Sequence, residues 1–515
     1  MFIKSLLVIL FFAVMVGVGL YCRNKATDVN GFVLGGRSVG PWLTAFAYGT
    51  SYFSAVIFVG YAGQFGWKFG VASTWIGIGN AFLGSLLAWV VLGRRTRLMT
   101  QHLNSATMPE FFGKRFNSKA LKIGAAAIVF VFLIPYTASL YNGLSRLFGM
   151  AFNIDYSICV IIMAALTAVY VIAGGYFATA VNDFIQGIVM LFGIVAVVMA
   201  VLGQNGGFLS SLKALSEVTD PAYEGFSGVF ASFFSGDPLN LLFVVILTSL
   251  GTWGLPQMVQ KFYAIKSEKD INKGTIISTI FAVIVAGGCY FMGGFGRLFL
   301  TSEEVAAQGY DAIVPAMLSN LPDLLIGIIM VLVLSASMST LSSLVLTSSS
   351  TLTLDFIKGN IVKDMDEKKQ VRTMRWFILV FIVISVVLAI LQYKVGLSMI
   401  AQLMGVSWGA LAGAFLAPFL YGLYWKKTTK AGAWASFIFG CGLMLYNMFF
   451  KSTMPAFLQS PINSGAVAML AGLIIVPIVS LFTKKPDAAI VDDAFSCYEQ
   501  KVLVPARESL GEEDK

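Results

Sequence analysis

The fold is decided by the stretch Ala45-Phe-Ala-Tyr-Gly-Thr-Ser-Tyr-Phe-Ser-Ala-Val-Ile-Phe-Val-Gly60, which is apolar enough to cross a membrane but is weakened at its centre. Gly49 and Gly60 bracket a polar segment that contains Thr50, Ser51, Tyr52 and Ser54. Glycine costs about 1 kcal/mol in a helix interior, and unwound backbone in a membrane is tolerated only where it faces protein or a water-filled site. The stretch therefore predicts a broken membrane helix whose freed carbonyl oxygens can bind a hard cation. Close helix packing through small residues is the alternative interpretation.

Composition extends this interpretation to the whole chain. Of its 515 residues, 57% are hydrophobic and 12% are charged, whereas soluble proteins are usually about 25% charged. We therefore expect an all-α integral membrane protein that forms one helical bundle. A span needs about 20 mainly apolar residues, and runs of this length predict about thirteen transmembrane helices, at residues 2–22, 41–65, 70–94, 121–150, 156–175, 178–203, 239–262, 272–299, 311–357, 373–393, 396–424, 431–450 and 464–483. The ninth run is too long for one straight span, so part of it must lie outside the membrane.

The loop charges predict the orientation. Lys and Arg gather in the odd-numbered loops, for example at Arg94, Arg95 and Arg97, whereas the even-numbered loops carry acids such as Glu217 and Asp220. By the positive-inside rule this pattern places the N-terminus outside and the C-terminus in the cytoplasm. The protein is then a multi-pass protein of the plasma membrane. The net charge of +9 indicates orientation and not binding of nucleic acid.

Residue types that carry catalysis or bind metals are sparse. The five cysteines form no CxxC pair, and the only histidine, His102, lies in a polar loop. No paired acids, metal cluster or nucleophile elbow stands in a suitable context. The sequence therefore predicts no enzyme, no cofactor, no metal other than sodium and no obligate protein partner.

A second polar feature lies in the ninth span, in Leu334-Ser-Ala-Ser-Met-Ser-Thr-Leu-Ser-Ser-Leu344. Serines three and four residues apart share one helix face, and here these are Ser335, Ser339, Ser342 and Ser343, with Thr340 beside them. An uncharged stripe of hydroxyl oxygens suits a monovalent cation that must be released again. Alternatively, these side chains bond back to the preceding turn and aid packing.

The third feature is Asp183, in Gly174-Gly-Tyr-Phe-Ala-Thr-Ala-Val-Asn-Asp-Phe-Ile-Gln186. An acid at the centre of a span costs about 2.5–3.5 kcal/mol and usually faces a polar interior. The cost is smaller for Asp183 because it is expected near the inner end of the sixth span. Asp183 is therefore either a cation ligand or the N-cap of that span.

Four motifs in the same order resemble the sodium/solute symporter family. They are Phe32-Val-Leu-Gly-Gly-Arg-Ser-Val-Gly40, Gly174-Gly-Tyr-Phe-Ala178 with Asn182-Asp-Phe-Ile-Gln186, Ala336-Ser-Met-Ser-Thr-Leu-Ser-Ser343 with Leu354-Asp-Phe-Ile-Lys358, and Gly422-Leu-Tyr-Trp-Lys-Lys427 with Lys430-Ala-Gly-Ala433. Together they cover residues from about 30 to 450 and span most of the chain.

The resemblance implies a LeuT-like fold, in which spans two to six and seven to eleven form two inverted five-helix repeats. One extra helix precedes the repeats and two follow. The expected divisions are a first helix with its inner loop at 1–40, a ten-helix transport core at 41–425, two C-terminal helices at 426–485 and a cytoplasmic tail at 486–515.

The resemblance also implies the sodium ligands. The family's principal site combines carbonyls of the broken helix with the eighth core helix, at positions that match Thr50, Phe53, Ala336, Ser339 and Thr340. Some members have a second site nearer the cytoplasm, whose positions match Asp183, Ser339, Ser342 and Ser343. All four keep suitable oxygens in this chain.

The solute is predicted less directly. The expected pocket residues are Tyr52, Ser54, Val56, Tyr136, Thr137, Thr248 and Trp253. Proline carriers have an aspartate at the position of Tyr52 and tryptophans at those of Val56 and Thr248. The local sequence around Tyr52 and Asp183 is more similar to the pantothenate carriers. A sugar carrier is disfavoured, because Ile57 stands where a glutamine is expected.

These patterns together predict a sodium-coupled symporter that imports a small organic solute by alternating access. Pantothenate-like, amino-acid-like and monocarboxylate-like solutes remain alternatives. A proton-coupled carrier of the same fold is the first rival, although the hydroxyl and carbonyl groups do not titrate near neutral pH. A solute sensor that acts through a partner is the second rival. It is disfavoured because the tail is too short for a signalling domain.

Overall fold

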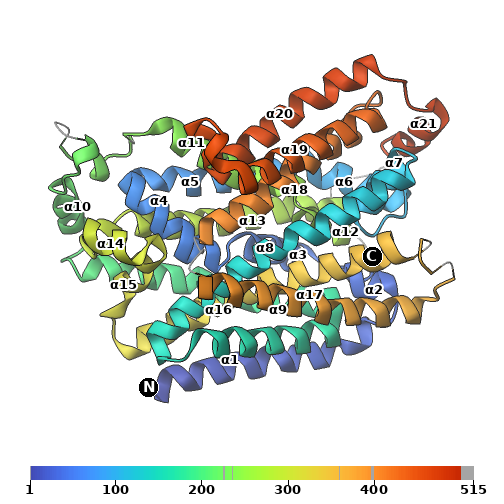
Figure 1. The fold of residues 1–515 in the computed structure, drawn as a ribbon. Coiled ribbons are helices and arrows are strands. Elements are labelled where there is room, and N and C mark those ends of the chain that lie inside the picture. Colours follow the sequence, from blue (N-terminus) through green and yellow to red (C-terminus); the bar gives the residue numbers. More distant parts are fainter. Residues whose placement is uncertain are drawn as a thin grey trace, which may run out of the picture.

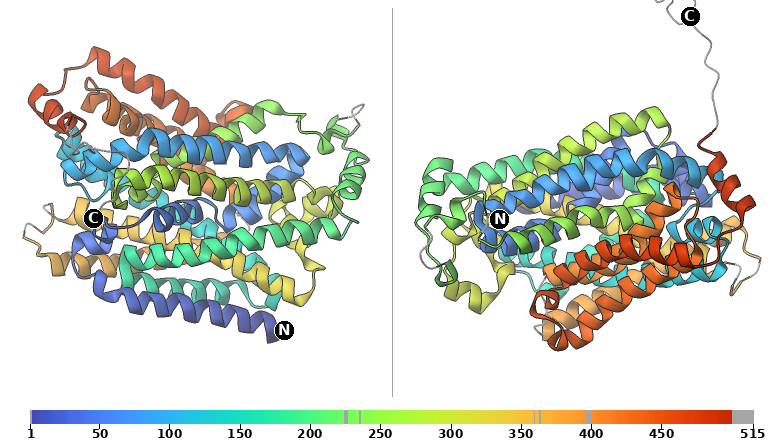
Figure 2. Two further views of the ribbon diagram at one scale, coloured as in Figure 1. Left: turned by 180° about the vertical axis from the view of Figure 1, so that it is seen from behind. Right: turned by 90° about the horizontal axis from the view of Figure 1, so that it is seen from above.

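The computed structural model describes residues 2–223, 227–234, 236–358, 360–362, 364–395 and 400–499. These residues form a bundle of helices that lie roughly side by side (Figures 1 and 2). The main ones are α1 (Phe2–Tyr21), α8 (Lys119–Phe152), α9 (Tyr156–Gly203), α13 (Glu268–Gly293), α16 (Asp323–Thr351), α17 (Glu367–Val395), α18 (Ile400–Tyr424), α19 (Lys430–Phe450) and α20 (Pro461–Phe482). The expected all-α membrane class is confirmed.

The helix that begins at Pro41 is broken, as expected. The first half, α3 (Pro41–Tyr52), ends where Phe53 adopts an extended backbone, and a π-helix (Val56–Tyr61) followed by α4 (Ala62–Phe69) continues the chain. The break lies between the two bracketing glycines rather than at either of them. A Cβ on Gly49 would meet Phe281 at 2.4 Å, and one on Gly60 would meet Ile400 at 2.9 Å. The glycines therefore allow close helix packing, and the stretch combines this packing with a break; cation binding by its carbonyls stays a prediction.

The third predicted span continues beyond its expected end. Short helical segments, α5 (Thr74–Gly79), two π-helices (Asn80–Leu87 and Trp89–Gly93) and α6 (Arg94–His102), follow one another. A separate short helix, α7 (Met108–Arg115), then leads into α8. The ninth predicted run is divided as expected, because α15 (Ile313–Ser319) precedes α16 and a final π-helix (Leu352–Ile357) follows it.

Two further interruptions fall inside long helices. Within α9, Gly175 has φ 56° and ψ −153°, a conformation that breaks the helix close to the predicted boundary between spans five and six. On the second predicted repeat, α11 (Pro238–Gly254) and α12 (Pro256–Ala264) meet at an angle of 47°. The first helix of each predicted repeat is therefore interrupted, as an inverted-repeat carrier requires.

The expected count of about thirteen spans is not confirmed. Among the described residues, ten helices are long and apolar enough to cross a membrane, or eleven if the bent pair α11–α12 forms one span. Two of them, Val56–His102 with 47 residues and Tyr156–Gly203 with 48 residues, are more than twice as long as the roughly 20 residues that one crossing needs. Each of these two coincides with parts of two neighbouring predicted spans.

The two ends of the bundle differ in what they carry. The short helices α10 (Phe208–Ser216), α14 (Ser302–Gln308) and α15 gather at the end where α1 begins (Figure 1). The other end carries α2 (Val29–Leu34), α7 and α21 (Ala488–Ser496). The loops that were predicted to share one side of the membrane therefore lie together.

Candidate functional site

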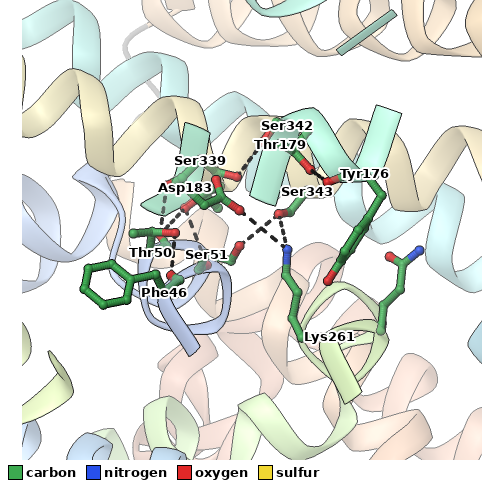
Figure 3. Close-up of polar contacts among 12 residues, drawn as sticks. Phe46, Thr50, Ser51, Tyr176, Thr179, Asp183, Lys261, Ser339, Ser342 and Ser343 are labelled. Carbon is green, nitrogen blue, oxygen red and sulfur yellow. Dashed lines mark hydrogen bonds and ion pairs between the residues drawn. The ribbon is translucent and has the colours of Figure 1, made fainter. Parts of the chain in front are cut away.

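The broken helix and the hydroxyl stripe meet in the centre of the bundle. The carbonyl of Thr50 accepts a hydrogen bond from Ser339 Oγ at 3.0 Å (Figure 3). It also lies 3.3 Å from Thr340 Oγ1. The carbonyl of Ser51 also lies 3.4 Å from Thr340 Oγ1, and that of Ala336 lies 3.2 and 3.0 Å from the two hydroxyls, so these carbonyls are alternative acceptors for the one proton of each hydroxyl. Three carbonyl and two hydroxyl oxygens thus converge between α3 and α16, and all five residues are buried.

The cluster offers the kind of ligands that a hard cation prefers, because its oxygens are uncharged and buried. The structure brings together four of the five residues predicted for the principal site, Thr50, Ala336, Ser339 and Thr340, and adds Ser51. Phe53 lies at the end of α3, and in the described part of the chain its carbonyl takes no hydrogen bond from α16. The site assignment itself stays a prediction.

The serines of α16 divide between the two interpretations of the stripe. Ser335 bonds back to the carbonyl of Val331 at 2.7 Å, and Ser342 to that of Ser339 at 2.8 Å. Ser339, Thr340 and Ser343 instead reach the broken helix. The hydroxyls that bond to another helix are therefore the candidates for cation ligands.

Asp183 lies inside α9 and not at a helix end. It comes eight residues after the break at Gly175 and is fully buried. The N-cap interpretation is therefore wrong. Neither carboxylate oxygen of Asp183 has a hydrogen bond within the described residues.

The partner of Asp183 is Lys261, on α12. Its Nζ lies 3.8 Å from Asp183 Oδ2 and donates to Ser343 Oγ at 3.0 Å, while its ammonium lies 5.2 Å from the centre of the Tyr176 ring (Figure 3). Ser343 Oγ also hydrogen-bonds Ser51 Oγ at 2.8 Å. The ammonium is thus linked to the broken helix through Ser343, in the region predicted for a second sodium ion.

Sequence reasoning missed Lys261. The seventh predicted span, 239–262, contains it near its inner end, where it resembles an ordinary loop cation. The sequence feature that could have identified Lys261 is Pro256, five residues earlier. A new helix, α12, begins at this proline inside the bundle. A lysine on such a segment faces the protein and not the loop, and here it is 2% exposed.

A cluster of aromatic side chains lies directly beside the ion cluster. Tyr52 follows Ser51, and its hydroxyl donates to the carbonyl of Thr248 at 2.5 Å. The ring of Trp408 lies 6.1 Å from that of Tyr52 and 5.9 Å from that of Tyr136. The Tyr136 hydroxyl and the Trp408 indole N–H are buried without a hydrogen-bond partner in the described chain. Two buried polar groups without a well-formed hydrogen bond therefore border the break.

The other residues predicted for the solute pocket are distributed around this cluster. Thr248 supplies its carbonyl to Tyr52, but its hydroxyl bonds back to Val244 at 2.8 Å. Thr137 likewise bonds back to Leu133 at 3.0 Å. Ser54 Oγ accepts from the backbone N–H of Val56 at 3.2 Å, within the break itself.

Trp253 points to a different helix, because its indole donates to the carbonyl of Leu83 at 3.0 Å. Trp408, which the sequence did not single out, contacts both tyrosines instead. In an apolar span, the sequence does not distinguish an aromatic residue that lines a pocket from one that faces lipid. Only the packing in the structure identifies Trp408 as a neighbour of the two tyrosines.

At the end of the bundle that carries α7 and α21, two distant segments are joined by contacts of Val39 and Arg37 with backbone groups. Val39 pairs with the segment after α12, because its N–H reaches the carbonyl of Ala264 and its carbonyl accepts from Lys266 at 2.9 Å. Arg37 donates to the carbonyls of Tyr263 at 3.0 Å and Ser105 at 2.7 Å. These contacts tie the start of the first core helix to the end of the bent pair.

Cavities lie at both ends of the bundle. At the α7 end, one of about 460 Å³ is lined by Arg37, Glu110 and Lys122 among others. At the opposite end, one of about 690 Å³ is lined by Trp67, Lys68, Asp220, Asn240 and Arg297 among others. Tyr52 and Tyr136, by contrast, are fully buried. The structure is therefore a form in which the aromatic cluster is shut off from solvent.

Comparison with known proteins gives the family. The model of the sodium:solute symporter family matches residues 32–440. The osmoregulated proline transporter OpuE of Bacillus subtilis (strain 168) is 29% identical over 484 residues, which cover 93% of this chain and 95% of that protein. The sodium/proline symporter of Staphylococcus aureus (strain JH9) is 29% identical over 506 residues, which cover 95% and 94%.

Solved structures give the same fold. A substrate-bound, outward-open Na+-coupled sialic acid symporter superposes with a TM-score of 0.74 at 16% identity, over 95% of this chain and 99% of that chain. Mhp1, a nucleobase-cation-symport-1 family transporter, does so with a TM-score of 0.52 at 13% identity, over 90% and 97%. At these identities the likeness supports the fold alone.

The fold and the comparisons define a LeuT-like membrane carrier. The chain belongs to the sodium:solute symporter family. It is a sodium-coupled solute symporter and not an enzyme.

Proposed function

We propose that this protein imports a small zwitterionic amino acid, of which proline is the first candidate, together with sodium. The observation that carries the proposal is the contact between the Thr50 and Ser51 carbonyls and the hydroxyls of Ser339 and Thr340, immediately before Tyr52. The ion ligands and the aromatic cluster share one helix break. A bound sodium ion therefore fixes the backbone from which Tyr52 projects.

The solute class follows from the chemistry around the break. The cluster of Tyr52, Tyr136 and Trp408 is uncharged, which favours a solute without net charge. A carboxylate suits the positive dipole end of the half-helix that starts after Ser54. The N–H groups of Val56, Ile57 and Phe58 already bond to Ser54, so the helix dipole and not these groups would attract it. The unpartnered hydroxyl of Tyr136 is a further donor. Both relatives described above are named as proline carriers, and this chain matches each of them over nearly its whole length. These matches favour proline over pantothenate.

The mechanism is alternating access within a core at 41–425, with the N-terminus outside and the C-terminus in the cytoplasm. Sodium holds α3 against α16, the solute binds beside Tyr52, and the contacts of Arg37 and Val39 then open toward the cytoplasm. A membrane potential of 100 mV contributes about 2.3 kcal/mol per charge moved. At about 1.4 kcal/mol per decade, one sodium accumulates a neutral solute roughly 50-fold.

Solute counterflow in proteoliposomes tests the solute class. Vesicles loaded with unlabelled proline, pantothenate, lactate or a sugar are each diluted into a trace of the same solute in labelled form, in sodium. We expect internal proline, and to a lesser degree its close analogues, to drive a transient accumulation of label. Counterflow driven by pantothenate or lactate but not by any amino acid would contradict the proposed solute.

Gly84 provides a test of the pocket. A Cβ on this residue would lie 2.1 Å from the Tyr52 hydroxyl, so Gly84→Ala must displace Tyr52. Overpacking of this kind costs about 1–3 kcal/mol, and we expect the KM for solute to rise about tenfold or more while the half-saturating sodium concentration changes less. Gly287→Ala is the matched control, because its Cβ meets nothing within 4 Å. Equal KM values for solute in the two variants would contradict the assignment of Tyr52 to the solute pocket.

A further inference from the structure

Lys261 and Asp183 form a fully buried ion pair in the transport core. Lys261 is 2% exposed and Asp183 is 0% exposed. A buried pair of this kind contributes little net stability, because the desolvation of each ion costs several kcal/mol. Ionisable residues inside a membrane usually mark ion paths. The pair therefore calls for a functional account.

The Lys261 ammonium lies among the groups that a second sodium ion would need. Ser343 Oγ accepts its hydrogen bond at 3.0 Å, and Asp183 Oδ2 lies 3.8 Å away (Figure 3). Two other groups of the predicted second site, Ser339 and Ser342, lie on the same α16 segment and are joined by a hydrogen bond at 2.8 Å. The lysine thus presents a positive charge to the oxygens that would otherwise bind the ion.

Charge balance allows one cation here and not two. Asp183 carries the single negative charge, and Lys261 is its only ion-pair partner in the described chain. A sodium ion added beside the ammonium would leave one uncompensated positive charge in a dry site, at a cost of several kcal/mol. The ammonium and a second sodium are therefore alternatives.

We propose that Lys261 is a tethered cation that takes the place of a second sodium ion, so that the carrier couples transport to one sodium at the principal site. This proposal rests on the sodium coupling proposed above. The ammonium is linked to that site through two hydroxyls. It donates to Ser343 Oγ, which hydrogen-bonds Ser51 Oγ, and the carbonyl of Ser51 is an acceptor for the Thr340 hydroxyl. Lys261 therefore holds the part of α3 at Ser51 against α16, as a sodium ion would. Unlike a sodium ion, it is not released into the cytoplasm with the solute.

The test is equilibrium binding of ²²Na⁺ to the purified full-length protein in nanodiscs, without solute. We expect one sodium per wild-type chain and two per Lys261→Ala chain, because the variant leaves Asp183 and the serine oxygens without their cation. The double variant Lys261→Ala/Asp183→Asn should return to one, and Lys261→Arg should stay at one. Replacing choline with sodium should also raise the melting temperature of the Lys261→Ala chain by more than it raises that of the wild type.

The outcomes separate this proposal from the proposed function. Two sodium ions in the wild type would overturn the role of Lys261, whatever the variants do. So would a Lys261→Ala chain that binds one ion, or one whose melting temperature gains no more from sodium than that of the wild type. A wild type that binds none would contradict sodium coupling itself, whereas a gain of one ion in Lys261→Ala would still support the tethered cation.

Discussion

Replacing Ser339 or Thr340 with alanine should raise the sodium concentration for half-maximal uptake by about 10- to 100-fold. Each hydroxyl reaches the carbonyls of Thr50 and Ala336, so each variant removes one oxygen from a site that has few. A polar contact to a charged group contributes about 1.5–3 kcal/mol, and each 1.4 kcal/mol is a factor of about ten. Uptake measured over a sodium series in proteoliposomes gives the shift directly.

Ser335→Ala is the matched control for these two variants. Ser335 lies one turn earlier on the same helix but bonds back to Val331, so its removal should leave the sodium dependence within about twofold of wild type, as expected for a back-bonded helical serine. The solute KM measured at saturating sodium should change little in all three variants. If Ser339→Ala and Thr340→Ala match Ser335→Ala in sodium dependence, the principal site lies elsewhere.

Asp183→Asn should destabilise the protein more than the loss of either hydroxyl at Ser339 and Thr340. Asparagine nearly matches aspartate in size but leaves the Lys261 ammonium buried without its counter-charge. Breaking one side of a buried pair costs about 3–5 kcal/mol. Thermal melting of the purified protein in sodium and in choline measures the loss.

The two sides of the pair should not be equivalent. Sodium can replace the charge that Lys261→Ala removes, but no ion that the carrier transports can replace the carboxylate of Asp183. Sodium should therefore raise the melting temperature of Lys261→Ala more than that of Asp183→Asn, which keeps only the principal sodium site. The double variant Asp183→Asn/Lys261→Met should be more stable than Asp183→Asn, because it buries no unpaired charge. Equal responses of the two single variants to sodium would show that the pair is merely structural.

Local chemistry in the sequence was sufficient to predict the broken helix and the hydroxyl stripe. The polar residues of 49–54 had no acceptable place on a lipid face, and the serine spacing fixed one face of α16. The exact point of the break was not predictable. Gly49 and Gly60 serve contacts with Phe281 and Ile400, which lie far away in the sequence, whereas the backbone opens at Phe53.

Long-range pairing explains why two residues of the site could not be predicted from the sequence. The insertion cost of an acid indicated that Asp183 faces the protein interior, and the structure confirms this. Its partner Lys261 lies on a helix that restarts at Pro256, and only the packing of α12 against α9 and α16 reveals the pair. Trp408 was missed for the same reason, because a tryptophan in an apolar span is equally suited to lipid and to a pocket.

Solute accumulation under separate ion gradients tests the central claim most directly. Proteoliposomes take up labelled proline, or the solute that counterflow selects, under an inward sodium gradient or an inward proton gradient, at one clamped potential. We expect accumulation with the sodium gradient, none with the proton gradient in choline, and one positive charge moved per neutral solute. Accumulation that follows the proton gradient and ignores sodium would contradict the account.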